Sequence, residues 1–558
     1  MPKRIPKEIG TMKKILIVIL GIVIMVSGAS SAPASVKANL NNPFQGINII
    51  ESSRFAEYPV ALMGTRESGN DASYFLCSSI SDETCTASLS IFAWNHLPPC
   101  TDSIAVNCIA NIFATAGDGV KTEGKFVKYA TSDSRYDYPA RELNNLPQGK
   151  SQGGIWQIPG ITHSGGNDYY FASTFVNAWL DKAPGSKIST EKFTFATIES
   201  GIQPVNEITG RYAPSFPVDS SNPSNDGSKN GGLGASVNPG APSGANSCLL
   251  TSTGICYMPQ DFPRDYRFGM KIILGSPLQG WFHGRIFQPT IDIQSNGSGQ
   301  VITFEAKPVQ VPTLTKIVST SEVTGKFREY LRGDRVFSQG GPYFQPGNSG
   351  TEAIEMAGFW LPLVNDKATT SNTYWNVRTL GGNQDPDVAR CSNDSSKLAG
   401  VVTTNSLVYS AGPPSYNKAE GSLDYKLLSP HFTATGEEAI GTYDLVLRSD
   451  VARCIYGFSK APIQAVVSIV GSGGENKVAT TLIRERDGWL TLSANGFTFS
   501  SPTIRVKLSQ SASETEILAP VVPAKVSVKK TTITCAKGKK VQRIYGVKPK
   551  CPTGYKKR

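Results

Sequence analysis

The spacing of the cysteines constrains the fold of this chain more than any other feature. Ten cysteines occur among the 558 residues: Cys77, Cys85, Cys100, Cys108, Cys248, Cys256, Cys391, Cys454, Cys535 and Cys551. In an exported chain, an even number of cysteines predicts a set of disulfides. The first three successive pairs all have the spacing C-x7-C. Repetition of one spacing predicts three local bridges, each on a short loop or hairpin.

The other four cysteines then pair as Cys391 with Cys454 and Cys535 with Cys551. This connectivity is an expectation, because the four cysteines nearest the N-terminus alone allow three arrangements. The alternative is a metal site, which usually combines closely spaced cysteine pairs with histidines. Of the four histidines, only His96 is near cysteines in the sequence. We therefore expect disulfides, with no metal site and no cofactor.

The N-terminal 38 residues have the three parts of a secretory signal peptide. A basic stretch precedes the apolar run from Ile15 to Val26, and the small residues of "SGASSAPASVKA" follow it. Cleavage is expected after Ala34 or Ala38. An uncleaved anchor is the alternative, but the run is shorter than the ~20 residues that span a bilayer. The sequence predicts an extracellular or cell-surface location, with no transmembrane segment after cleavage.

The positive charge of the chain lies at its ends. The formal net charge is +11, but residues 525–558 hold twelve Lys or Arg and no Asp or Glu. Residues 1–524 therefore carry −1, and residues 1–38 account for +5. The intervening body is then about −6, so the basic pI does not indicate a body that binds nucleic acid.

The basic C-terminus alternates like two strands joined at "AKGKK" and is expected to be closed by a Cys535–Cys551 bridge. A hairpin of this size needs such a bridge to be stable. It would display a dense set of cations toward anionic polymers of the cell envelope. The expected envelope-binding residues are Lys537, Lys539, Lys540, Arg543, Lys548, Lys550, Lys556 and Lys557. The alternative is a disordered, solubilising tail.

The pattern T-I-T-C-x-K-G-K…K-P-K-C-P-x-G-Y-K-K, from Thr532 to Lys557, resembles a short C-terminal element on many uncharacterised secreted proteins of actinobacteria. It covers about 30 of the 558 residues. The resemblance implies export and residence at the cell surface. It implies nothing about catalysis, because the proteins that carry the element are diverse.

The body between the two ends is predicted to be mainly β. The charged fraction of the whole chain is low, at 18%, and short alternating runs in the body are separated by turns rich in Gly and Pro. Five such runs between residues 440 and 510 predict a β-sandwich, with Asp487-Gly488 and Asn495-Gly496 as hairpin turns. Helical spacing from Val323 to Leu331 and again after Thr351 predicts two short helices. Phe359 and Trp360 are expected to pack in the core.

These features predict a chain in five parts. The large N-terminal part is a β-sandwich or jelly-roll-like domain with a long insertion, although two separate domains are the alternative. The parts are a signal peptide (1–38), a β-rich domain (39–318) with a mobile loop (214–246), a helical bridge (319–380), a β-sandwich (381–515) and a basic disulfide-closed tail (516–558).

No catalytic residue is identified from the sequence. Ser349 in "PGNSGTE" resembles a protease nucleophile, but His283 is not in the matching context, and a serine without a base is inert. The chain has no phosphate-binding loop, GxSxG elbow, HExxH or dinucleotide fingerprint. A glycosidase pair of carboxylates on separate strands leaves no local motif. The aromatic-rich stretches "DYYFASTFVNAW" and "GWFHGRIF" are either sugar-stacking platforms or core.

Two functions fit these observations. The first is a secreted, cell-surface structural or adhesive protein that its basic tail retains at the envelope. The alternative is a secreted carbohydrate-binding or carbohydrate-active protein, with glycans as partners. A cleft that holds two carboxylates favours an enzyme, whereas a sandwich without a cleft favours the first function.

Overall fold

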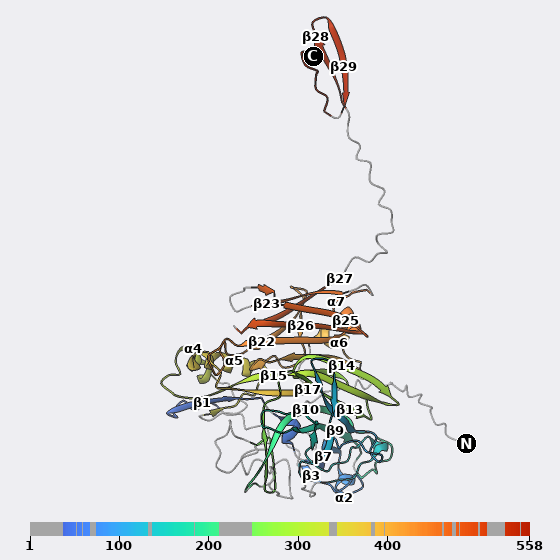
Figure 1. Ribbon diagram of the computed structural model, residues 1–558, viewed down its shortest axis with the longest axis vertical. Helices are drawn as coiled ribbons and strands as arrows, with labels where there is room; N and C mark the ends of the chain where they lie inside the picture. Colours follow the sequence, from blue (N-terminus) through green and yellow to red (C-terminus); the bar gives the residue numbers. More distant parts are fainter. Residues whose placement is uncertain are drawn as a thin grey trace, which may run out of the picture. The chain divides into compact units, whose positions relative to one another are not determined.

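The computed structural model describes residues 37–558 apart from 52, 59, 67–73, 132–136, 184, 211, 213–247, 334–342, 381–384, 395–396, 460–462, 471–475, 479, 500–502, 511–530 and 547. Most of the expected signal peptide and all of the expected loop at 214–246 lie outside the described residues. The chain divides into two compact units, residues 1–509 and 510–558. Both are mainly β, as the sequence predicts (Figure 1).

The first unit is organised by one continuous path of hydrogen-bonded strands. The path runs through β3 (Tyr74–Leu76), β2 (Ala61–Thr65), β4 (Ser90–His96), β9 (Tyr169–Asp181), β10 (Thr194–Thr209), β17 (Thr370–Thr379), β14 (Gly280–Asn296), β18 (Leu398–Thr404), β22 (Ile440–Arg448), β26 (Trp489–Thr498) and β25 (Thr480–Arg486). Neighbours are antiparallel except β14 and β18, which are parallel. Two further strands, β7 (Lys125–Tyr129) and β8 (Gly154–Gln157), extend the sheet beside β9.

A second layer packs on the N-terminal half of this path. It contains β6 (Lys121–Glu123), β5 (Cys108–Ala116), β13 (Tyr266–Leu274) and β15 (Gly299–Ser319). From Ile286 onward β14 pairs with β15 instead of β17 and β18, with a register shift between Phe287 and Thr290. Ile112 and Ile272 from this layer share a buried core with Val176 and Ile202 from the first. Two sheets joined by strands that bend between them form a sandwich.

A second sandwich occupies the C-terminal half of the first unit. Its smaller sheet contains β19 (Val408–Tyr409), β20 (Ser415–Asn417), β21 (Ser422–Leu428), β23 (Ile463–Val470), β24 (Asn476–Val478) and β27 (Thr503–Gln510). Tyr425, Val467 and Val506 from this sheet pack against Leu445 and Leu492 from β22 and β26. Figure 1 shows β23 and β27 lying over β22, β25 and β26. The predicted C-terminal sandwich is therefore present.

The expected boundaries at residues 318 and 380 do not separate the sheets. The predicted helices form as α4 (Gly325–Arg332) and α5 (Thr351–Trp360), followed by the 3-10 turn η2 (Leu361–Val364). However, β17 also falls in the expected bridge and lies inside the large sheet. Parallel pairing of β18 with β14 then makes the large sheet common to both sandwiches.

The helices cover a core of their own. Trp360 is fully buried there, as the sequence predicts, and Phe359 is half-buried and packs against the same core. The same core includes β1 (Phe44–Ile49), which pairs with β15 and with β16 (Tyr343–Phe344). None of the helices that the structure describes has the length and apolarity that a membrane span requires.

The two expected hairpin turns have different outcomes. Asp487-Gly488 joins β25 to β26, and both residues have positive φ, as a two-residue hairpin needs. The prediction for Asn495-Gly496 is wrong. These residues lie inside β26, where the register with β22 shifts and Gly496 has φ 75°. A glycine with positive φ also builds a β-bulge, so the local sequence does not distinguish the two.

All five expected disulfides form, and no free cysteine remains. Cys391–Cys454 joins α6 (Pro386–Cys391) to α7 (Ser449–Tyr456) across 63 residues of sequence. Cys248–Cys256 clips β11 (Leu250–Ser252) to β12 (Ile255–Pro259). The remaining short elements of this unit are α1 (Arg54–Glu57), α2 (Glu83–Ala87) and η1 (Glu142–Asn144).

Candidate functional site

The second unit is a small sheet closed by a disulfide. Strands β28 (Thr531–Lys537) and β29 (Lys540–Gly546) form the expected hairpin, with Gly538 at φ 60° in the turn. A third strand, β30 (Lys556–Lys557), returns beside β28 and was not expected. Cys535 is fully buried and bonded to Cys551. A sheet of this size cannot form a sufficient hydrophobic core, so the disulfide takes the place of that core.

The cationic side chains of this sheet are exposed to solvent. The eight expected envelope-binding residues are all exposed: Lys537, Lys539, Lys540, Arg543, Lys548, Lys550, Lys556 and Lys557. No Asp or Glu occurs in residues 525–558. The strand register places Lys537 opposite Lys540 at the turn, and Lys556 opposite Ala536, the residue next to Lys537. We call these eight residues on the closed sheet the basic hairpin.

The chemistry of the basic hairpin is that of a cluster of point charges. Lysine ammonium groups on a closed scaffold attract anionic polymers without a shaped pocket. The side chains are solvated, so the attraction is screened by salt over about 10 Å at 0.1 M. The arrangement can bind a polyanion, and it holds no acid, base or nucleophile arranged for catalysis.

Ser349 and His283 do not form a catalytic pair. Both lie near Tyr409: the backbone of Ser349 bridges to it, and the His283 ring stacks on it at 3.7 Å between centroids. However, Ser349 is exposed, whereas His283 is fully buried. Neither ring nitrogen of His283 has a hydrogen-bond partner among the described residues. Burial and the charges of Arg285 and Arg378 hold the pKa of His283 well below its usual value.

The two aromatic-rich stretches mostly build the core. Trp281 and Phe282 of "GWFHGRIF" are 1% and 0% exposed, so this stretch offers no stacking platform. In "DYYFASTFVNAW" only Tyr169 and Trp179 are exposed, and they lie at opposite ends of β9. Both stretches are therefore core strands, and the sugar-platform interpretation fails for them.

A buried ion pair lies between the two sandwiches of the first unit. No local sequence motif predicts it. Glu51 follows β1, and its Oε2 accepts a hydrogen bond from Nε of Arg285 on β14 at 2.7 Å. The two side chains are 1% and 0% exposed. Nη1 of Arg285 also donates to the carbonyl oxygens of Thr404 and Ser406, at 2.9 and 2.7 Å.

Further polar groups surround Glu51. Asn348 donates to Glu51, and Arg378 donates to Oδ1 of Asn348 at 3.0 Å and to the hydroxyl of Tyr409. Burial raises the pKa of Tyr409 and keeps the phenol protonated. Because these groups are buried and hydrogen-bonded to one another, we assign Glu51, Arg285, Asn348, Arg378 and Tyr409 a structural role.

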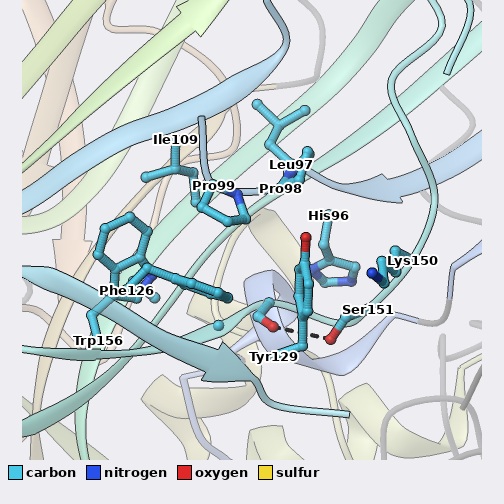
Figure 2. Close-up of a pocket in the computed structure, with 13 residues that line it drawn as sticks. His96, Leu97, Pro98, Pro99, Ile109, Phe126, Tyr129, Lys150, Ser151 and Trp156 are labelled. Atoms are coloured by element: carbon cyan, nitrogen blue, oxygen red, sulfur yellow. Dashed lines mark hydrogen bonds between the residues drawn. The ribbon is translucent and has the colours of Figure 1, made fainter. Parts of the chain in front are cut away.

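A small pocket beside β4 contains His96 (Figure 2). Its volume of about 10 Å³ suits a single water and no larger ligand. Nε2 of His96 lies 2.7 Å from the carbonyl oxygen of Tyr58, which can only accept, so Nε2 carries the proton. Nδ1 then accepts from the hydroxyl of Ser173 at 2.6 Å. Burial lowers the pKa of His96 from 6.5 to about 4, so the ring is neutral at pH 7.

His96 is expected to make the protein less stable in acid. Its pKa is lower in the folded chain, so the unfolded chain binds the proton more readily. Stability is then full above pH 6.5 and falls as the pH drops toward 4. The difference is on the order of 3 kcal/mol. Denaturant unfolding across this range should show a shallower pH dependence for His96→Gln than for the unaltered protein; parallel curves would contradict the assignment.

Among the described residues, no group of three His, Cys, Asp or Glu side chains is placed to hold a metal ion. Comparison with protein-family models, with curated proteins and with solved structures finds no match to this chain. The function must therefore be argued from the residues themselves.

Proposed function

We propose that this protein is exported and acts at the cell surface as a structural or adhesive protein, retained on anionic polymers of the cell envelope by its basic hairpin. The observation that carries the proposal is the exposure of eight cations, without any carboxylate, on a sheet that a disulfide closes. Five disulfides in one chain fit an oxidising compartment. The actinobacterial resemblance of residues 532–557 and the signal-like N-terminus agree with this location.

Retention at the envelope is assigned to the basic hairpin alone, and the body of the protein does not contribute to it. The body carries the opposite net charge, about −6 over residues 39–524, so an anionic polymer attracts the tail and repels the body. Retention should therefore depend on charge number and on salt, and little on the chemical identity of the polymer.

The test compares binding to purified cell walls and to polyphosphate. Changing Lys539, Lys540, Lys548 and Lys550 to Gln should weaken binding roughly a hundredfold, since each cation near an anionic surface contributes about 1 kcal/mol before screening. A chain that ends at Ala524 should not bind. Binding of the full chain should be lost at about 1 M salt, where screening acts over about 3 Å.

The matched control changes Lys125, Lys187, Lys192 and Lys307 to Gln. These four lysines are exposed on the first unit, and their loss alters the net charge by the same amount. Binding should remain close to that of the unaltered protein. Equal weakening by both sets, or binding by the chain that ends at Ala524, would refute retention by the basic hairpin.

A further inference from the structure

The first unit has a cleft of about 620 Å³ that is open to solvent. It lies where the start of α7 meets the β25–β26 hairpin and the start of β18. Six of its lining residues bear on its chemistry: Lys397, Arg448, Asp450, Arg453, Glu485 and Trp489. The volume is within the range of small-ligand sites, about 300–1,000 Å³. The cleft is separate from the basic hairpin, which belongs to the other unit.

The charged groups of the cleft are paired within the protein. Arg448 donates from Nε to Asp450 at 2.9 Å. Arg453 binds both oxygens of Glu485, at 2.7 and 3.2 Å, and also donates to the carbonyl oxygen of Ser459. These pairs hold planar groups in fixed positions. Because the charges cancel locally, the cleft does not select a strongly charged ligand.

The paired carboxylates still have hydrogen-bonding capacity for a ligand. An ionised carboxylate offers about four lone-pair sites, of which Arg453 occupies one on each oxygen of Glu485. The side chain of Asp450 is 64% exposed and that of Glu485 is 29% exposed, so lone pairs on both face solvent. Exposed acceptors of this kind match a ligand rich in hydroxyl groups, each of which donates one hydrogen bond and accepts others.

Trp489 adds a flat apolar surface. It begins β26, where its backbone pairs with Arg448 on one side and Arg486 on the other. Its indole is half-buried and packs against the main core, which fixes its orientation. Aromatic faces carry partial negative charge, and the C–H groups of a sugar ring pack favourably on them. A rigid indole beside neutralised polar groups therefore suits a saccharide better than a peptide or an anion.

We propose that this cleft binds a short neutral oligosaccharide, with one ring on Trp489 and its hydroxyl groups donating to the carboxylates of Asp450 and Glu485. The binding is independent of the basic hairpin. It gives the cell-surface protein a second point of contact, with glycan chains.

We expect Asp450 and Glu485 to bind a saccharide without hydrolysing it. A glycosidase needs one carboxylic acid with a raised pKa as its general acid. The hydrogen bond from Arg453 lowers the pKa of Glu485. Burial acts to raise the pKa of Asp450, but the hydrogen bond and charge of Arg448 outweigh it and lower the pKa. Both groups are therefore ionised at pH 7, and neither can deliver a proton to a leaving group.

The test uses the full chain and soluble cello-, xylo-, manno-, malto- and chito-oligosaccharides, whose neutrality prevents attraction to the basic hairpin. At least one should bind in calorimetric titration. Trp489→Ala should weaken that binding about tenfold. Asp450→Asn, at an exposed position that does not threaten folding, should weaken it about fivefold. Trp179→Ala removes an exposed tryptophan outside the cleft and should leave the affinity unchanged.

Three results would overturn the proposal: failure of every oligosaccharide to bind, binding that both cleft variants leave intact, or release of reducing sugar. Polyphosphate retention by the basic hairpin is measured separately. A failure here therefore leaves that proposal standing, and the reverse also holds.

Discussion

Replacing Glu51 by glutamine is expected to lower the free energy of unfolding by about 3–5 kcal/mol. Glutamine keeps the size of the side chain but removes its charge, so the fully buried Arg285 loses its counterion. Arg378, whose Nη1 lies 3.9 Å from Glu51, loses part of its compensation as well. A buried charge without a partner costs far more than the pair itself contributes. Denaturant unfolding followed by tryptophan fluorescence measures the loss.

The control is Glu207→Gln, the same change in an exposed ion pair. Glu207 binds Lys128 at 2.8 Å, with side-chain exposures of 39% and 44%. Pairs of this kind contribute about 0–1 kcal/mol, so the control should be near neutral. A similar small loss for both variants would show that Glu51 does not stabilise the junction between the sandwiches.

Removing the Cys391–Cys454 bridge should have an effect of comparable size. Opening a loop with 63 residues of separation restores chain entropy to the unfolded state worth about 4 kcal/mol. Changing both cysteines to Ala should create little cavity volume in the core, since Cys454 is exposed. The same change frees α6 from α7, whose residues Asp450 and Arg453 line the cleft. Oligosaccharide affinity should therefore fall together with stability.

A local bridge supplies the comparison. The Cys100–Cys108 loop has a separation of 8 residues, and its loss should cost about 2.5 kcal/mol on the same entropy model. Unfolding midpoints of the two double variants, measured side by side, rank the bridges. If the local bridge proves equally or more stabilising, the loop-length argument is wrong for this protein.

Predictions from the sequence succeeded where the residues of a short stretch are enough to determine its local structure. Alternating apolar residues from 503 to 510 give β27, because Ile504, Val506 and Leu508 are buried and the residues between them are not. Gly538 supplies the positive φ that the turn between β28 and β29 needs. The C-x7-C spacings correspond to local bridges for the same reason, since each pair lies within one small loop.

The predictions failed where partners are distant in sequence. Asn495-Gly496 became a bulge because β22 lies opposite it in a shifted register. The large sheet continues across the expected boundary at residue 380, because β18 pairs with β14, which lies more than a hundred residues earlier in the sequence. The cleft likewise joins Lys397, Arg453 and Glu485 from separate elements. None of these relations leaves a local pattern, so one sequence cannot reveal them.

Local periodicity, spacing and composition were enough to predict the mainly β class, the five bridges and the cations of the basic hairpin. Three features came from the folded chain alone: one sheet serves both sandwiches, Glu51 binds Arg285, and a charge-balanced cleft opens beside Trp489. Long-range strand pairing and burial of charge depend on which distant segments meet, and the order of residues along the chain does not encode that directly.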